Sequence, residues 1–195
     1  MDDDKIASRK EWERAVKLHR WVERLRRTRP LDDIIEVVEA RRRKAKDDDF
    51  YTLSFELQHL LIDAGRECEA DQIIDQMIAH LPDDVRFPIG KATLYLYGIK
   101  DPKRALDAIN SALVRAHRTG FFRREALGVK ARILLELGLG EQLSQTLEEI
   151  MSLEMKPGIP DIMRERDFVD RALSGMIAED VLTRYNVFCP KQDKK

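Results

Sequence analysis

Apolar residues recur along the chain at offsets of three, four and seven, the spacing that gathers them on one face of an α-helix. Three stretches repeat this spacing from starts that lie 35 and 38 residues apart. Their apolar-face positions are Ala70, Ile73, Ile74 and Met77, then Ala105, Ala108, Ile109 and Ala112, then Leu143, Thr146, Leu147 and Ile150. Only nine Gly and seven Pro interrupt the pattern, which therefore predicts an almost entirely α-helical protein.

Turn and capping residues divide the predicted helices into pairs. Ser8 and Glu11 have the spacing of a capping box at a helix start, and Asp101-Pro102 combines a favoured N-cap with a favoured first residue. Gly65 suits the left-handed residue that ends many helices. The paired segments are expected over residues 9–28 and 31–46, 50–64 and 69–81, 85–99 and 102–119, 121–137 and 141–155, and 161–173 and 176–188. This order describes a series of helix hairpins.

Helix–turn–helix units that recur near 34 residues resemble tetratricopeptide repeats. Repeats that start at Tyr51, Arg86 and Arg124 place small or bulky residues where that family favours them. The matching residues are Ala70, Ile74 and Pro82, then Ala105, Ile109 and Ala112, then Ala131 and Leu147. The departures are Gln58, Met77 and Leu143. The resemblance covers roughly residues 50–155.

The resemblance implies an all-α, tetratricopeptide-like solenoid of antiparallel helix hairpins, an α–α superhelix. One hairpin cannot bury its own apolar stripe, so neighbouring hairpins must stack. We expect a single domain over residues 1–195, with a divergent N-terminal hairpin at 9–46, three repeat hairpins at 50–155 and a C-terminal helical cap at 160–188. An irregular bundle of amphipathic helices is the alternative.

Residue types that carry catalysis or bind metals are present, but they form no recognisable constellation. The histidines fall on four different predicted helices without metal-ligand spacing, at His19, His59, His80 and His117. Gly138-Leu139-Gly140 lacks the Lys-Ser/Thr of a phosphate-binding loop. Cys68 is flanked by two Glu, whose charge disfavours a thiolate. We therefore predict a protein that is not an enzyme, with no catalytic residue, metal or cofactor.

The family resemblance also implies a concave groove lined by the first helix of each hairpin, where such proteins commonly bind an extended peptide or a partner helix. Carrying the groove positions over gives Phe55, Glu56, His59 and Asp63, then Lys91, Leu94 and Tyr97, then Val129, Arg132 and Glu136. The Lys, Asn and Arg that grip a C-terminal carboxylate in one subfamily are absent. With Tyr97 as an aromatic anchor beside the cations Lys91 and Arg132, the groove suits a partly acidic peptide. Packing between helices is the alternative role for these side chains.

Positive charge is concentrated near the N-terminus. Residues 1–46 hold 15 Lys and Arg and 10 Asp and Glu, whereas the whole chain has a net charge of −1. The predicted basic patch consists of Arg20, Arg24, Arg27, Arg41, Arg42 and Arg43. Such a patch can neutralise phosphates of a nucleic acid. Interspersed carboxylates and an isoelectric point near 6.5 instead favour a solvated helix face or a dock for an acidic partner.

The first residues lack the pattern of a secretory signal, and no apolar run approaches the roughly 20 residues that cross a bilayer. We therefore expect a cytoplasmic protein that binds a protein or peptide partner as an adaptor or scaffold, without membrane association. The alternative is a nucleic-acid-associated regulator that uses the basic N-terminal helices. A homodimer is a further hypothesis, because Trp12 and Trp21 would form a seam if the chain itself leaves them uncovered.

Overall fold

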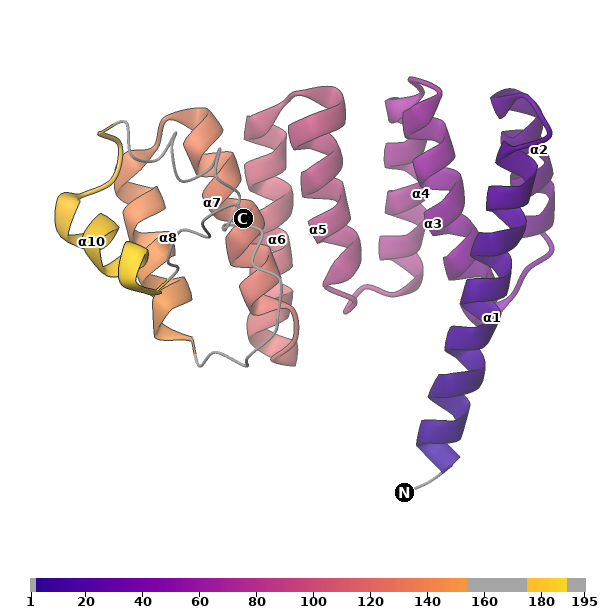
Figure 1. The fold of residues 1–195 in the computed structure, drawn as a ribbon, viewed down its shortest axis with the longest axis horizontal. Coiled ribbons are helices and arrows are strands. Elements are labelled where there is room, and N and C mark those ends of the chain that lie inside the picture. The colour runs from indigo at the N-terminus through magenta and orange to yellow at the C-terminus, as the bar shows by residue number, and fades with distance from the viewer. Residues whose placement is uncertain (1–2, 154–174, 189–195) are drawn as a thin grey trace, which may run out of the picture. The chain divides into compact units, whose positions relative to one another are not determined.

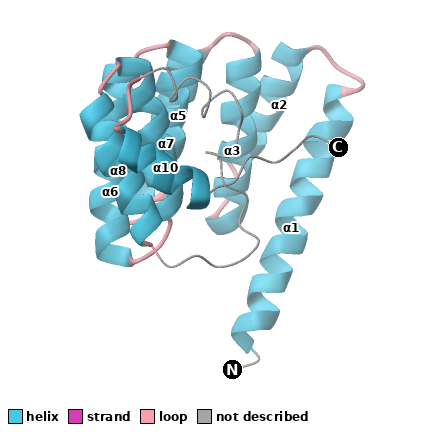
Figure 2. Ribbon diagram, turned by 60° about the vertical axis from the view of Figure 1, so that its left-hand side comes forward, coloured by secondary structure: helices cyan, strands magenta, loops and turns pink. Residues whose placement is uncertain are grey.

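The computed structural model describes residues 3–153 and 175–188. Within these ranges every regular element is a helix, as the periodicity predicts (Figure 2). The contacts between residues divide the chain into two compact units, Met1–Pro82 and Asp83–Lys195. Each unit is built from helix hairpins with a core of its own.

The first unit contains two antiparallel hairpins (Figure 1). Its helices are α1 (Asp3–Arg26), α2 (Leu31–Arg42), α3 (Asp47–Asp63) and α4 (Glu67–His80). Helix α3 packs against the three others. Apolar side chains from all four helices fill the interior, among them Val22, Ile34, Val38, Leu57, Leu60 and Ile74. The hairpin predicted at residues 9–46 is therefore present.

The predicted helix boundaries in this unit that differ most from the structure are the start of α1 and the end of α2. Helix α1 begins at Asp3, so Ser8 lies inside the helix instead of capping its start. The structure does not describe the side chains of Ser8 and Glu11, the two residues of the predicted capping box. Helix α2 ends at Arg42, although the apolar and basic pattern predicts that it continues to residue 46. The chain turns after Arg42 because the next helix, α3, must fold back against α2.

The second unit contains two further hairpins and a terminal helix. Its elements are α5 (Arg86–Thr93), which continues directly into the π-helix η1 (Leu94–Ile99), then α6 (Pro102–Thr119), α7 (Arg123–Leu137), α8 (Gly140–Ser152) and α10 (Glu179–Phe188). Helix α10 confirms the second segment of the predicted C-terminal cap. The first segment, at 161–173, lies outside the described residues. The predicted helix over residues 85–99 is thus an α-helix followed by a wider π-helical turn.

Local signals in the sequence end and begin these helices as predicted. The Asp101 carboxylate accepts a hydrogen bond from the backbone N–H of Arg104 at 3.1 Å, and Pro102 is the first residue of α6. Such a cap satisfies a backbone donor that the helix itself leaves free. Gly65 has a φ of 68° after α3, the left-handed conformation that glycine adopts without steric penalty.

The repeat inferred from the apolar pattern is confirmed by burial. The twelve positions are buried on α4, α6 and α8, with Ala108 as the exception that is partly exposed. Hydrogen bonds within the described residues carry the same period, because seven of them that involve side chains join residues 34 to 37 positions apart. The pairs are His19–Glu56, Arg26–Asp63, Arg42–Gln76, Asp83–Arg118, Tyr97–Arg132, Ser144–Ala178 and Glu148–Arg184. Equivalent positions of successive hairpins therefore face each other.

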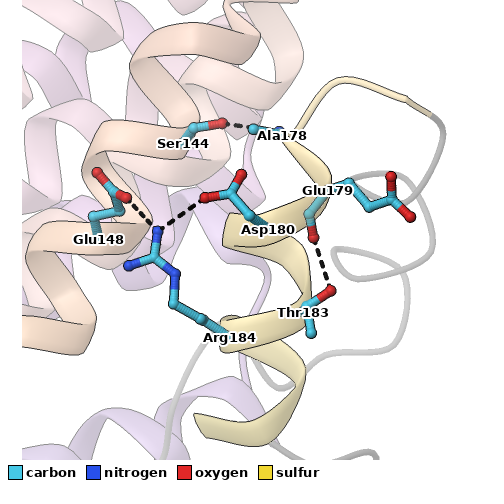
Figure 3. A network of polar contacts seen from close by, with 7 residues as sticks. All are labelled: Ser144, Glu148, Ala178, Glu179, Asp180, Thr183 and Arg184. Atoms are coloured by element: carbon cyan, nitrogen blue, oxygen red, sulfur yellow. Dashed lines mark hydrogen bonds and ion pairs between the residues drawn. The ribbon is translucent and has the colours of Figure 1, made fainter.

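Helix α10 covers the last hairpin through both apolar and polar contacts (Figure 3). Ile177, Val181 and Tyr185 share one core cluster with residues of α7 and α8. At the rim, the Arg184 guanidinium lies 2.5 Å from a Glu148 oxygen, and the backbone N–H of Ala178 donates to the Ser144 hydroxyl at 3.3 Å. The segment before α10 thus returns to the surface of α8.

Gly140, the first residue of α8, marks the closest approach of this segment. A Cβ atom added at Gly140 would overlap the carbonyl oxygen of Met176. The atoms that this Cβ would meet belong to the backbone of Met176, so no flexible side chain can move away to make room. Only glycine therefore lets the chain before α10 reach the start of α8.

We predict that Gly140→Ala lowers the free energy of unfolding of the second unit by about 1–3 kcal/mol, the usual penalty of overpacking. The matched control is Gly90→Ala in α5, where an added Cβ meets nothing within 4 Å. This control should raise stability by about 0.5–1 kcal/mol, because alanine is the better helix former. Urea unfolding followed by circular dichroism measures both. Equal effects of the two substitutions would contradict the close approach at Gly140.

Candidate functional site

In the first unit, the predicted groove residues lie along α3. Phe55 and His59 are exposed, and their ring centroids are 6.4 Å apart. Glu56 Oε1 lies 2.8 Å from His19 Nδ1 of α1, and its side chain is only 15% exposed. An Arg26 Nη atom of α1 donates to Asp63 at 2.7 Å. Helix α1 engages both carboxylates, and of the four predicted groove residues on α3, Phe55, His59 and Asp63 remain exposed.

In the second unit, an exposed tyrosine is held between two successive first helices. Tyr97 of η1 is 54% exposed, and its hydroxyl accepts a hydrogen bond from Arg132 of α7 at 3.2 Å. Glu136 is exposed four residues further along α7. The structure therefore brings together Tyr97 and Arg132, two of the predicted site residues.

Cations surround a second, buried tyrosine beside this surface. The Lys91 ammonium lies 5.6 Å from the ring centroid of Tyr95, and the Arg104 guanidinium lies 4.1 Å from it. Arg104 also donates to the Tyr95 hydroxyl at 2.6 Å. Cations at these distances are attracted by the negative face of an aromatic ring. Tyr95 and Arg104 are not among the predicted site residues. The signal in the sequence is their spacing: they lie nine residues apart, on either side of the turn between η1 and α6.

Two predicted groove residues belong to the core instead. Leu94 is 2% exposed and Val129 is 6% exposed. Leu94, Tyr95 and Leu96 are all buried where the π-helix begins. In a regular amphipathic helix, three consecutive residues are not expected to be buried together. π-Helical turns are often found at functional sites. The prediction that Leu94 and Val129 contact a partner is therefore wrong, because neither side chain reaches the surface.

The predicted basic patch is divided by the structure. Arg20 and Arg24 are exposed on α1, and Arg27 is exposed in the turn that follows this helix. On α2, the Arg41 guanidinium lies 4.4 Å from the ring centroid of Trp21, and Arg43 is paired with Glu39. Trp12 remains largely exposed on α1. Arg41 and Arg43 are nevertheless exposed, so of the six predicted patch residues only Arg42 is buried.

Arg42 corrects the prediction most clearly, because it is a buried residue and no part of a surface patch. It is 7% exposed. Its Nε donates to the Ser54 hydroxyl at 2.7 Å and an Nη atom donates to the Gln76 side-chain oxygen at 2.6 Å. Its guanidinium carbon also lies 4.6 Å from the ring centroid of Phe50. Burial lowers the pKa of Arg42, and the charge of Glu39 partly offsets this effect.

A cavity of about 510 Å³ lies beside Arg42, at the end of the unit where α2 ends and α3 begins. Its lining residues are Arg42, Arg43, Ala45, Lys46, Asp48, Phe50, Tyr51 and His80. This volume is in the range of small-molecule pockets. Sequence reasoning missed the cavity, because its walls come from three helices and only folding brings them together.

The described residues form neither a metal-binding cluster nor a membrane-spanning helix. No group of three or more His, Cys, Asp or Glu there is placed to hold a metal ion. None of the described helices is long and apolar enough to cross a membrane.

Comparison with known proteins agrees with the architecture. No protein-family model and no curated protein matches the chain. Among solved structures, the chain is similar to a protein from Podosopora anserina described as a kinesin light chain with nearly identical TPR-like repeats. The two structures superpose with a TM-score of 0.62 at 13% sequence identity, and the match covers 93% of this chain and 98% of that chain. A tetratricopeptide repeat protein from Parabacteroides merdae is similar with a TM-score of 0.58, 17% identity and coverage of 94% and 68%. The chain therefore has the all-α fold of a tetratricopeptide-like helix-hairpin solenoid.

We predict that Ser54→Ala lowers the free energy of unfolding of the first unit by about 1–3 kcal/mol, because it leaves the buried Nε of Arg42 without its acceptor. Chemical denaturation measures the change. The same substitution at Ser111, which is exposed on α6, should change stability by less than about 0.5 kcal/mol. If Ser54→Ala were as neutral as Ser111→Ala, the Arg42–Ser54 hydrogen bond would contribute nothing.

Proposed function

We propose that the protein is a non-catalytic adaptor that binds a peptide or a helix of a partner protein through the exposed faces of its first helices. One observation carries this proposal: Tyr97 is 54% exposed and is nevertheless held by Arg132 of the neighbouring first helix. Tyrosine combines an apolar ring with a polar tip, and it is enriched at protein interfaces. A ring fixed in this way loses little conformational freedom when a partner covers it.

The charges around Tyr97 support a partly acidic ligand. Arg132 donates to the Tyr97 hydroxyl with one nitrogen atom, and Lys91 lies on the same first helix that leads into η1. Both side chains are only partly buried, so a carboxylate of the ligand can approach them from solvent. On the α7 side, the carboxylate of Glu136 repels negative charge, so only a limited number of acidic groups of the ligand can bind there. An extended peptide with an apolar residue over Tyr97 and an acidic residue near Arg132 satisfies these groups.

In the first unit, the exposed rings of Phe55 and His59 form a second contact surface for a partner. The similarity to tetratricopeptide-like structures supports protein binding only as an analogy of fold, since one fold serves many functions. The cytoplasm is the compartment we propose for this activity, in keeping with the sequence.

The proposal is tested with a photo-cross-linking amino acid placed at Tyr97 in cells that express the protein. The matched control carries the same amino acid at Val114, which is 73% exposed on the second helix α6. We expect protein adducts from position 97 and none of the same size from position 114. The adducts should persist after nuclease treatment.

A second variant checks that the charge of Arg132 is recognised. Arg132→Gln should reduce the yield of cross-links from position 97 at least tenfold, because it removes a charge-assisted contact to the ligand. Adducts of equal yield at 97 and 114, or adducts that disappear with nuclease, would contradict partner binding by this surface.

A further inference from the structure

Arg42 of the first unit is buried without a direct ion pair inside the described part of the chain, since Glu39, whose charge acts on it, forms its ion pair with Arg43. Among the described residues, no carboxylate oxygen lies within ion-pair distance of the Arg42 guanidinium. The hydrogen-bond acceptors of Arg42 are a serine hydroxyl and a glutamine amide oxygen, which are both neutral. The guanidinium also contacts the Phe50 ring. Buried charges in proteins are normally paired, because removing an ion from water is expensive. Within the described residues, Arg42 therefore lacks an anion in direct contact with its guanidinium.

The cavity described above adjoins this charge and is large enough to admit an anion. Among the described residues that line it are the cations Arg42, Arg43 and Lys46 and one carboxylate, that of Asp48. Arg43 already pairs with Glu39 at 2.7 Å, whereas Lys46 is exposed and has no ion pair within the described part of the chain. Arg42 and Lys46 are thus the two cations best placed to bind an anion. Their charges favour one that carries more than a single negative charge.

Aromatic side chains form the remaining wall, and one of them contacts the Arg42 guanidinium. Phe50 packs edge-on against Tyr51 at 5.5 Å and is stacked with His80 at 5.2 Å, as measured between ring centroids. Arg42 lies over the same Phe50 ring. The Tyr51 hydroxyl and the His80 ring are polar groups that can donate to an oxygen of a ligand. The cavity therefore combines a fixed guanidinium, a mobile ammonium and neutral donors.

We propose that this cavity, which we call the Arg42 cavity, binds the phosphoryl group of a phosphate monoester or of free phosphate. A phosphoryl group carries close to two negative charges at neutral pH and presents three strong acceptor oxygens. Guanidinium and ammonium groups bind such oxygens through short charge-assisted hydrogen bonds. A carboxylate has one charge and two oxygens, so it satisfies fewer of the donors around the cavity. The site is independent of the Tyr97 surface, which lies in the other unit.

The proposal is tested on the full chain by NMR titration with inorganic phosphate and with O-phosphoserine, at an ionic strength held constant with sodium chloride. We expect saturable shifts of the amide signals of Phe50, Tyr51 and His80. Lys46→Ala should weaken binding at least tenfold, because it removes one charge-assisted contact. The matched control is Lys44→Ala, which removes an exposed lysine two residues away that does not line the cavity and should leave the affinity within twofold. Circular dichroism verifies that both variants are folded.

A phosphoserine peptide flanked by Gly and Ser identifies the source of the phosphoryl group. Binding at least tenfold tighter than that of free phosphate assigns the cavity to a phosphorylated side chain of a protein, and equal affinities assign it to free phosphate or a small ester. Absence of saturable shifts with all three probes, or equal weakening by Lys46→Ala and Lys44→Ala, would overturn the proposal. Tyr97→Ala should not change phosphate binding, so failure of the adaptor function and failure of this site are distinguished.

Discussion

The distance between two packed helices depends on the size of the side chains that lie between them. At the start of the second helix of two hairpins this residue is alanine, and both Ala70 and Ala105 are fully buried. Protein interiors are packed without voids, so a small residue at this place means that the helices themselves come close. In the last hairpin Leu143 takes the equivalent place, and its cluster includes the small residue Ala131 of the opposite helix α7. A small residue on either helix of the hairpin therefore allows the two helices to pack closely.

The close approach within hairpins explains why contacts between hairpins follow one period. When each hairpin repeats the same geometry, residues one repeat apart come to face each other, and seven hydrogen bonds at separations of 34 to 37 residues record this. The candidate sites are consequences of the same spacing. It places Arg132 against Tyr97 on one surface, and it places Gln76 against the buried guanidinium of Arg42 beside the cavity. Structure and binding surfaces in this protein thus rest on one repeated register.

The helices, the hairpin order and the buried faces of α4, α6 and α8 could be predicted from the sequence, because periodicity and capping are local properties. The site was less predictable. Leu94 is buried because a π-helix replaces the expected α-helical turn, and such a change of helix type depends on packing around it. Arg42 faces inward because Ser54 and Gln76, from two other helices, supply acceptors. In a run of three arginines, no local signal shows which one will find partners after folding.

The central claim is that, where the second helix begins with a buried alanine, as at Ala70 of α4, the hairpin needs this small residue to close. Ala70→Leu tests it most directly, with Ala79→Leu as the control, because Ala70 is fully buried and Ala79 is exposed on the same helix α4. Urea unfolding should show that Ala70→Leu lowers the free energy of unfolding of the first unit by about 1–3 kcal/mol, while Ala79→Leu changes it by less than about 0.5 kcal/mol. Equal stabilities of the two variants would contradict the account, because the space between the helices would then accept a leucine.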